Sequence, residues 1–223
     1  MLLLKYIEII LSIPKSLYVN FRLLPFRQAV RLPILVRYNC NLVSLRGKVS
    51  LDKIKIGILK IGFGKVGVFD KRYNRSILQI QGLISLKGKA SFGQGARICV
   101  NTGGILNIGE RFNNTAEMTI VCYNKITIGD DVLTSWNTLI MDTDFHQTVN
   151  LESQEVSKSE APIYIGEKVW IGTRAVILKG SNVPNGCIIG ANSLINKKFI
   201  KENTLLAGNP ANIKKSNITL YMP

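Results

Sequence analysis

The sequence contains few of the residues that build metal and redox sites. Its 223 residues include one histidine and four cysteines, and the cysteines are dispersed at positions 40, 99, 122 and 187 without a C-x-x-C pair. Zinc sites need several histidine or cysteine ligands at short spacings, so we expect no bound metal. Dispersed free thiols are typical of a reducing compartment, and we therefore predict a cytoplasmic protein.

Long uncharged apolar runs are also missing. The N-terminal segment is rich in apolar and aromatic residues, but charged side chains interrupt it at Lys5, Glu8, Lys15, Arg22, Arg27 and Arg31. A membrane span needs about 18 to 20 predominantly apolar residues, and no small-residue cleavage site of a secretory signal follows an apolar region. We expect residues 1–48 to lie on the inner, anionic surface of the membrane as an amphipathic segment, or to cap the open end of the core.

Acidic residues are scarce in the first part of the chain. Residues 1–100 hold 18 Lys/Arg and 3 Asp/Glu, whereas residues 101–223 hold 11 of each, so the net charge of +15 lies entirely in the first part. This asymmetry favours an anionic partner such as a phospholipid surface, a pyrophosphate-bearing substrate or an acidic polymer. A solvated basic face without a partner is the alternative. No aromatic stacking motif accompanies the basic residues, so no nucleic-acid partner is predicted.

What the sequence does contain is a six-residue repeat. From Ile165 it reads IGEKVW, IGTRAV, ILKGSN, VPNGCI, IGANSL and INKKFI, with a branched aliphatic residue first in each hexad. A period of six fits no α-helix, but it fits short strands that alternate with turns and point one aliphatic side chain inward. The same register recurs upstream, with a two-residue insertion between Ile120 and Ile128. These features predict a folded β-solenoid of stacked coils.

One polar segment interrupts the repeat after Ile140, and we predict a protruding loop over residues 141–164. Such insertions commonly carry function. The loop begins with MDTDFHQ, which contains the sole histidine, His146, preceded by Asp142 and Asp144. On an extended segment these three side chains would point to one side, so either aspartate could orient the imidazole as a general base. A solvated histidine and a corner aspartate are the alternatives.

The hexads, followed by AGNPAN, resemble the C-terminal coils of the hexapeptide-repeat acyltransferases over roughly residues 84–215. LTSWNTLIMDTDFH and LYVNFRLLPFRQAVRLPILV look most similar to the sugar and polysaccharide O-acetyltransferases of surface-glycan synthesis. The resemblance implies an all-β, left-handed parallel β-helix over residues 49–215, with an irregular or helical segment before it and a tail over residues 216–223. It also implies a homotrimer with an acyl-coenzyme A site between neighbouring subunits.

The resemblance further implies an enzyme that transfers an acetyl group from acetyl-coenzyme A to a hydroxyl of a sugar or surface-polysaccharide precursor. His146 would be the general base, with Asp144 as the first and Asp142 as the second supporting candidate, and the oxyanion donor would be a backbone N–H, at Gly172 of a neighbouring chain. The expected coenzyme A contacts are Trp170, Gly172, Thr173, Ala191, Asn196, Lys197, Lys214 and Lys215. The residues expected to line the acceptor site are Asn113, Asn114, Glu117 and Trp136.

The chain departs from the family pattern near the expected phosphate contacts. Asn212 follows Asn-Pro-Ala where the family usually has Lys or Arg, and KFIKEN follows Lys197 where Asp-Ile-Pro is usual. The alternatives within the class are an amino-sugar N-acyltransferase and a serine acetyltransferase. Outside the class, a non-catalytic scaffold and, as a weaker alternative, a nucleic-acid binder are considered. A hexapeptide-repeat carbonic anhydrase is excluded, because its zinc site needs three histidines and the chain has one.

Overall fold

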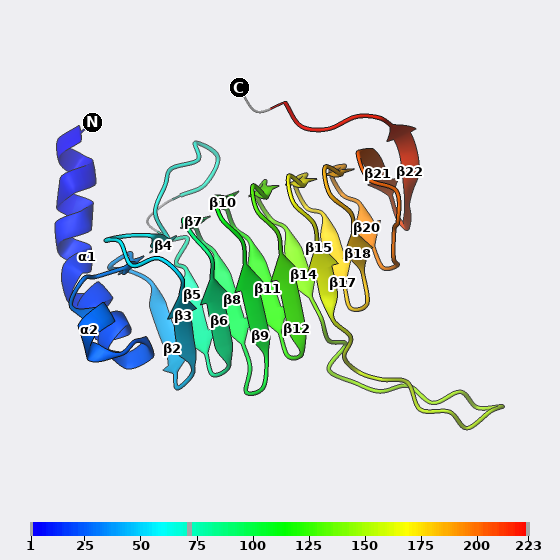
Figure 1. Cartoon of the computed structure of the whole chain (residues 1–223), viewed down its shortest axis with the longest axis horizontal. Helices are drawn as coiled ribbons and strands as arrows, with labels where there is room; N and C mark the ends of the chain where they lie inside the picture. Colours follow the sequence, from blue (N-terminus) through cyan, green and yellow to red (C-terminus); the bar gives the residue numbers. More distant parts are fainter. Residues whose placement is uncertain (1, 71–72, 222–223) are drawn as a thin grey trace.

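A computed structural model of the chain shows a β-solenoid with three sheet faces and a helix across one end (Figure 1). The structure describes residues 2–70 and 73–221. Successive strands pass from the first face to the second and the third and then return to the first, and the pairing within each face is parallel. The last strand, β22, instead pairs antiparallel with β21.

The first face is a 9-stranded sheet made of β1 (Ile34–Val36), β4 (Leu59–Ile61), β7 (Ala90–Gln94), β10 (Phe112–Ala116), β13 (Leu133–Thr134), β16 (Trp170–Ile171), β19 (Ile188–Ile189), β21 (Thr204–Gly208) and β22 (Ala211–Ser216). The second face is a 7-stranded sheet made of β2 (Asn41–Leu45), β5 (Ile77–Ile80), β8 (Arg97–Val100), β11 (Thr119–Cys122), β14 (Leu139–Met141), β17 (Val176–Leu178) and β20 (Leu194–Ile195). The third face is a 6-stranded sheet made of β3 (Lys48–Leu51), β6 (Leu83–Leu86), β9 (Ile105–Ile108), β12 (Lys125–Ile128), β15 (Ile163–Ile165) and β18 (Asn182–Val183).

The strand register reproduces the hexad period. From β15 to β20, paired residues are 18 positions apart, as Trp170 is opposite Ile188. Between β9 and β12 the step is 20, with Ile108 opposite Ile128. The two extra residues, 123–124, lie at the corner between β11 and β12. The predicted two-residue insertion at a corner is therefore confirmed.

The core of the solenoid is a column of side chains from the first hexad position. Each of these residues is at most 1% exposed: Ile165, Ile171, Ile177, Val183, Ile189 and Ile195. Small fifth-position residues such as Ala175 and Cys187 are buried beside them. Earlier in the chain, Phe92 and Phe112 fill the interior with ring centroids 5.0 Å apart. Burying an aliphatic or aromatic side chain of this size contributes about 1.5–3 kcal/mol, so the repeat itself supplies the main stabilisation.

The strands begin before residue 49, the predicted start of the β-helix. β1 pairs in register with β4, with Ile34 opposite Leu59, and β2 and β3 complete this first turn of the solenoid. The boundary at residue 49 falls inside β3. The first coil is therefore continuous with the solenoid, although its sequence shows no clear hexads.

The helix α1 (Leu2–Leu23) covers the first coil with a polar side (Figure 1). Asn20 donates from Nδ2 to the carbonyl oxygen of Ile34 at 2.7 Å and accepts the Ile34 N–H at 3.1 Å. The hydroxyl of Ser16 accepts the N–H of Val36 at 3.0 Å. Because β1 is the end strand of its sheet, its outward backbone groups need partners wherever a helix shields them from water. A buried polar stripe on α1 supplies these partners, which is the cap arrangement that the sequence left as one of two alternatives.

We predict that Asn20→Leu destabilises the fold by about 2–4 kcal/mol, because it leaves the buried N–H and carbonyl of Ile34 without partners. Urea unfolding followed by circular dichroism measures the change. The matched control is Gln147→Leu, an amide-to-leucine change at an exposed position far along the chain. Equal unfolding midpoints for the two variants would contradict the capping role of Asn20.

A short helix, α2 (Phe26–Ala29), follows α1 and leads into β1. Among the helices that the structure describes, none combines the length and the apolar character needed to cross a membrane.

Candidate functional site

The predicted loop is an antiparallel arm that projects from the corner between the second and third faces (Figure 1). We call residues 142–162, between β14 and β15, the arm. Bridges between Thr143 and Glu160 and between Val149 and Val156 join its two sides. The segment that breaks the hexads is therefore held by its own backbone pairing as well as by the solenoid.

Asp142 holds the base of the arm against the preceding coil. It is fully buried, and its carboxylate accepts the backbone N–H groups of Tyr123 at 2.7 Å and Asn124 at 2.9 Å. Burial raises the pKa of Asp142, and these backbone hydrogen bonds oppose the shift. The ring of Phe145 meets that of Tyr123 edge-on with centroids 5.2 Å apart. Tyr123 and Asn124 are the two inserted residues, and they supply the N–H donors and the ring that fix the arm. The two-residue insertion and the arm, which are the two interruptions of the repeat, are therefore in direct contact.

Asp144 and His146 lie on the exposed part of the arm, but not on one extended segment. Phe145 between them has a φ of 62°, and this left-handed conformation breaks the alternation of side chains that a strand would give. The carboxylate of Asp144 forms an ion pair with Lys179 at 2.7 Å. His146 is exposed and has no hydrogen-bond partner among the residues that the structure describes. The expectation that Asp142, Asp144 and His146 share one side therefore fails, because Asp142 is buried and Asp144 faces Lys179.

Lys179 is a site residue that the sequence reasoning missed. Its amino group also donates to the backbone oxygen of Lys158 at 2.5 Å, so it ties both sides of the arm to the next coil. Met141 is opposite Leu178 in the sheet, and the residues that follow these two therefore meet at one corner. Applying the register of the repeat across the loop would have found Lys179.

Several expected coenzyme A contacts gather at the corner between the first and second faces. The indole N–H of Trp170 lies 3.4 Å from the hydroxyl of Ser135, and the hydroxyl of Thr173 donates to the backbone oxygen of Trp136 at 2.9 Å. A Cβ at Gly172 would lie 2.7 Å from a backbone oxygen of the next coil, so only glycine fits the stacking there.

The backbone N–H of Gly172 already has a partner. It donates to the carbonyl oxygen of Ile189 at 2.8 Å within the same chain. Ala191, another expected contact, is exposed at the same corner one coil further along. The ladder bond argues against Gly172 as the oxyanion donor, because this N–H would have to leave the sheet to bind a reacting carbonyl.

The remaining expected coenzyme A contacts lie elsewhere on the solenoid. Asn196 and Lys197 are exposed at the corner that follows β20, and Lys214 and Lys215 are exposed on β22. The amino group of Lys197 donates to the side-chain oxygen of Asn212 at 2.8 Å. Asn212, which departs from the family pattern, therefore meets an expected phosphate contact. Within one chain the expected coenzyme A contacts are therefore divided between two corners and strand β22.

Two of the four residues expected to line the acceptor site have structural partners. Asn114 is 2% exposed, donates to the hydroxyl of Thr134 at 2.8 Å and accepts the N–H of Gly93 at 3.2 Å. Glu117 is 7% exposed and forms an ion pair with Arg97 at 3.0 Å. Its Oε1 has no hydrogen-bond partner among the residues that the structure describes. Asn114 is thus part of the coil stacking, whereas Glu117 retains an acceptor oxygen.

The other two acceptor candidates are accessible. Asn113 is exposed on β10, one position before the buried Asn114. Trp136 is 37% exposed at the corner between the first and second faces, and Phe69 meets it edge-on with ring centroids 6.4 Å apart. Neither accessible acceptor candidate therefore lies at the corner that carries His146: Asn113 is on the first face, and Trp136 is at the corner between the first and second faces.

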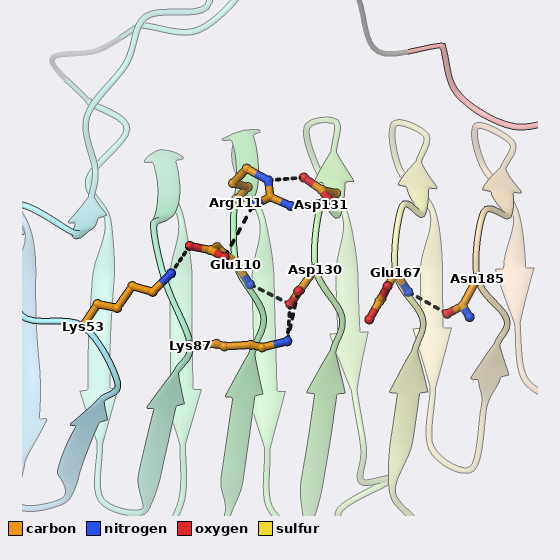
Figure 2. A network of polar contacts seen from close by, with 8 residues as sticks. All are labelled: Lys53, Lys87, Glu110, Arg111, Asp130, Asp131, Glu167 and Asn185. Carbon is orange, nitrogen blue, oxygen red and sulfur yellow. Dashed lines mark hydrogen bonds and ion pairs between the residues drawn. The ribbon is translucent and has the colours of Figure 1, made fainter.

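A charged network lies along the remaining corner, between the third and first faces (Figure 2). Lys53 pairs with Glu110 at 2.6 Å, and Lys87 pairs with Asp130 at 3.0 Å. The hydrogen bond from Lys53 lowers the pKa of Glu110, and the backbone N–H of Glu110 lowers the pKa of Asp130. Exposed pairs of this kind contribute little to stability individually, and this network is on a different corner from the arm. In the described part of the chain, no three His, Cys, Asp or Glu residues converge on a possible metal position.

The sequence resembles proteins named as acetyltransferases. No family model matches the chain. It is 27% identical over 156 residues to the putative lipopolysaccharide biosynthesis O-acetyl transferase WbbJ of Escherichia coli strain K12, covering 64% of this chain and 79% of that protein. It is 34% identical over 113 residues to the galactoside O-acetyltransferase of the same strain, covering 50% of this chain and 54% of that one. The chain thus spans about half the length of this second relative.

The fold is shared with a solved acetyltransferase structure. The crystal structure of the polySia-specific acetyltransferase NeuO aligns with a TM-score of 0.54 at 20% identity and covers 85% of this chain and 84% of that one. This likeness concerns the fold, and it confirms the predicted left-handed parallel β-helix. The stacked hexad coils and the relatives together confirm the resemblance predicted from the sequence: this chain is a hexapeptide-repeat β-helix protein similar to the sugar and polysaccharide O-acetyltransferases.

Proposed function

We propose that the chain transfers an acetyl group from acetyl-coenzyme A to a hydroxyl group of a sugar or surface-polysaccharide precursor. The similarity to O-acetyltransferases of lipopolysaccharide and galactosides supports this reaction class, in agreement with the sequence prediction. The observation that carries the proposal is the position of His146. The only imidazole of the chain is exposed and free of hydrogen-bond partners in the described structure, on an arm whose base is fixed to the solenoid.

In the proposed reaction, the sugar hydroxyl oxygen attacks the thioester carbonyl carbon while its proton passes to His146. The tetrahedral intermediate then expels the coenzyme A thiolate, which takes a proton from the imidazolium. The ester and the free thiol are the products. Histidine suits this role because its unperturbed pKa lies near neutral pH. Backbone N–H donors at a coil corner would stabilise the oxyanion.

The two aspartates receive different roles in this proposal. Asp142 positions the arm, because both oxygens of its buried carboxylate are engaged by backbone N–H groups. Asp144 stays the candidate that supports the imidazole, because it is exposed two residues from His146 and is held by Lys179. The ordering proposed from the sequence, with Asp144 first, is therefore retained.

A homotrimer is part of the proposal. Thr173 and Ala191 lie at the corner between the first and second faces, and Trp170 on β16 contacts Ser135 at this corner. His146 and Lys197 lie at the corner between the second and third faces. The three-faced core separates these corners within one chain. In a closed threefold ring, heterologous contacts bring one corner of a subunit against a different corner of the next. The base and the donor site would then meet between subunits.

We also propose a cytoplasmic location. The cysteines at positions 40, 99, 122 and 187 are all free thiols in the structure. Burial raises the pKa of the Cys122 thiol to about 12 and that of the Cys40 thiol to about 11. These two cysteines therefore act as small core residues, and free thiols persist in a reducing compartment.

Binding of acetyl-coenzyme A should raise the melting temperature of the purified protein. A ligand at about 100 times its Kd stabilises the native state by roughly 2.7 kcal/mol, and thermal unfolding with millimolar acetyl-coenzyme A measures the shift. AMP at the same concentration is the control, because it lacks the pantetheine arm. No shift with acetyl-coenzyme A would favour a non-catalytic scaffold. Activity on a panel of sugars then identifies the product, because an ester is cleaved by mild base and the amide formed by an N-acyltransferase is not.

A further inference from the structure

The helix α1 directs its polar side to the coils and an apolar surface to solvent. The exposed residues recur at helical spacing on the side opposite Ser16 and Asn20 and continue past the helix end. We call them the outer apolar face: Ile7, Ile10, Leu11, Leu17, Tyr18, Phe21, Phe26 and Val30. A surface helix of a soluble protein normally turns its apolar stripe to the core. In α1 the inward side mixes Ser16 and Asn20 with the buried Val19 and Leu23, because the edge strand β1 needs polar partners. Apolar residues also occupy the outward side of the helix.

The outer apolar face is continuous and well exposed. Ile10 is 62% exposed, Tyr18 56% and Phe26 72%. The rings of Phe21 and Phe26 lie 5.7 Å apart, so the face passes from α1 onto α2. Contiguous exposed apolar patches on soluble proteins mark interaction sites. The face therefore requires an apolar partner.

The charge around this face identifies the partner. Residues 1–50 hold 8 Lys/Arg and 1 Asp/Glu, and that single acid, Glu8, is paired with Arg37. The exposed arginines beside the face are Arg22, Arg27 and Arg31. A groove of about 590 Å³ beside the end of α1 is lined by Arg22 together with Arg46 and Lys48. A second copy of this end would bring like charges together, which disfavours self-association, whereas apolar and aromatic residues bordered by arginines fit an anionic lipid surface.

We propose that α1 and α2 dock the protein on an anionic phospholipid bilayer. The helix lies in the plane of the interface, its outer apolar face enters the boundary between headgroups and acyl chains, and the arginines contact the lipid phosphates. Figure 1 shows α1 across the end of the solenoid, so the coils extend from this contact with the arm at a distance from the membrane. The membrane-surface alternative predicted for the N-terminal segment is thus assigned to the same helix that caps the core.

Vesicle flotation of the full chain tests the apolar contribution. We expect binding to vesicles of phosphatidylcholine with phosphatidylglycerol, and weak binding to phosphatidylcholine alone. The triple variant Ile10→Gln, Leu17→Gln and Phe21→Gln should partition at least roughly 30-fold more weakly, because three buried apolar side chains are lost. The matched control makes the same number of exposed apolar-to-glutamine changes on the coils, at Ile56, Val68 and Ile200, and should float like the unchanged protein.

The charge contribution is tested in the same assay. Replacing Arg22, Arg27 and Arg31 by glutamine should weaken binding to anionic vesicles roughly 100-fold at low salt. Glutamine at Arg174, Lys198 and Lys201, which are exposed on the C-terminal coils, should have little effect. High salt should weaken binding of the unchanged protein as well.

Three results would overturn the proposal. The first is a failure of the protein to float with anionic vesicles at low salt. The second is flotation of the apolar triple variant equal to that of the unchanged protein. The third is a sedimentation change in the apolar variant without any change in flotation, which would identify the face as a contact between protein copies. Circular dichroism confirms that each variant is folded. Acetyl transfer to a soluble acceptor without lipid should be the same in the helix variants, so failure of this proposal is distinguishable from failure of the proposed enzyme activity.

Discussion

Replacing His146 by alanine should reduce acetyl transfer by roughly 10²–10⁴-fold, the usual contribution of a general base. The effect should fall on kcat, because the imidazole acts on the proton that leaves the hydroxyl during attack. Stability should change by less than about 0.5 kcal/mol, because the residue is exposed and lacks hydrogen-bond partners in the described structure. Initial rates of formation of the acetylated sugar measure the loss of activity. The melting temperature without and with acetyl-coenzyme A measures stability and donor binding.

The matched control for this variant is Gln147→Ala, which shortens the next exposed side chain of the same arm. It should keep most of the activity. If His146→Ala retained full turnover on an acceptor that the unchanged protein acetylates, another base would have to be sought. If His146→Ala lost the thermal shift by acetyl-coenzyme A together with its activity, the residue would instead serve donor binding.

Asp142→Ala should destabilise the fold by roughly 2–3 kcal/mol, because it leaves the backbone N–H groups of Tyr123 and Asn124 without their acceptors. For a chain of this size the melting temperature should fall by about 5–10 °C. Asp144→Ala is the matched control, since it also removes a carboxylate but one paired at the surface with Lys179. Exposed ion pairs contribute about 0–1 kcal/mol. Thermal unfolding of the two variants measures the contrast.

The pH dependence of Asp142 gives a further check on the same pair of variants. Burial raises the pKa of Asp142 in the folded chain. The stabilisation linked to this raised pKa is therefore fully present below the pKa of the unfolded chain and is lost as the pH rises through the folded pKa. Asp142→Ala should lose this dependence, and Asp144→Ala should keep it. Similar melting temperatures for the two variants would contradict the assignment of Asp142 to the base of the arm.

Much of the fold is encoded locally. Aliphatic residues such as Ile171 and Ile177 recur every six positions, and each must point inward for a short strand and a corner to repeat. This period predicts the solenoid, the insertion before Ile128 and the interruption after Ile140, and the structure agrees with all three. Handedness did not follow from the period, because left- and right-handed coils bury the same pattern. It came from the resemblance and is confirmed by the related fold.

The site could be predicted only in part. The motif MDTDFHQ singles out His146 because it is the sole histidine, but it does not separate the aspartates. Their separation depends on the left-handed conformation of Phe145 and on the donors offered by the neighbouring coil. Lys179 lies far from Asp144 in sequence and meets it because the coils stack. Contacts of this kind depend on the length of every coil in between, and a one-residue change in any corner would alter them.

The N-terminal segment shows most clearly which features follow from the sequence and which depend on the tertiary structure. Its apolar and basic composition by itself determined that the segment would contact either the open end of the core or an anionic membrane surface. In the same way, the repeat by itself determined a solenoid. Only the tertiary structure decided which side of α1 faces inward. The open edge of β1 presents backbone groups that must be bonded when they are shielded from water, so Ser16 and Asn20 turn inward beside Val19. Other apolar residues of the helix, such as Ile10 and Tyr18, turn outward. That preference is set by the edge of a sheet built from distant residues, and helical periodicity alone does not contain it.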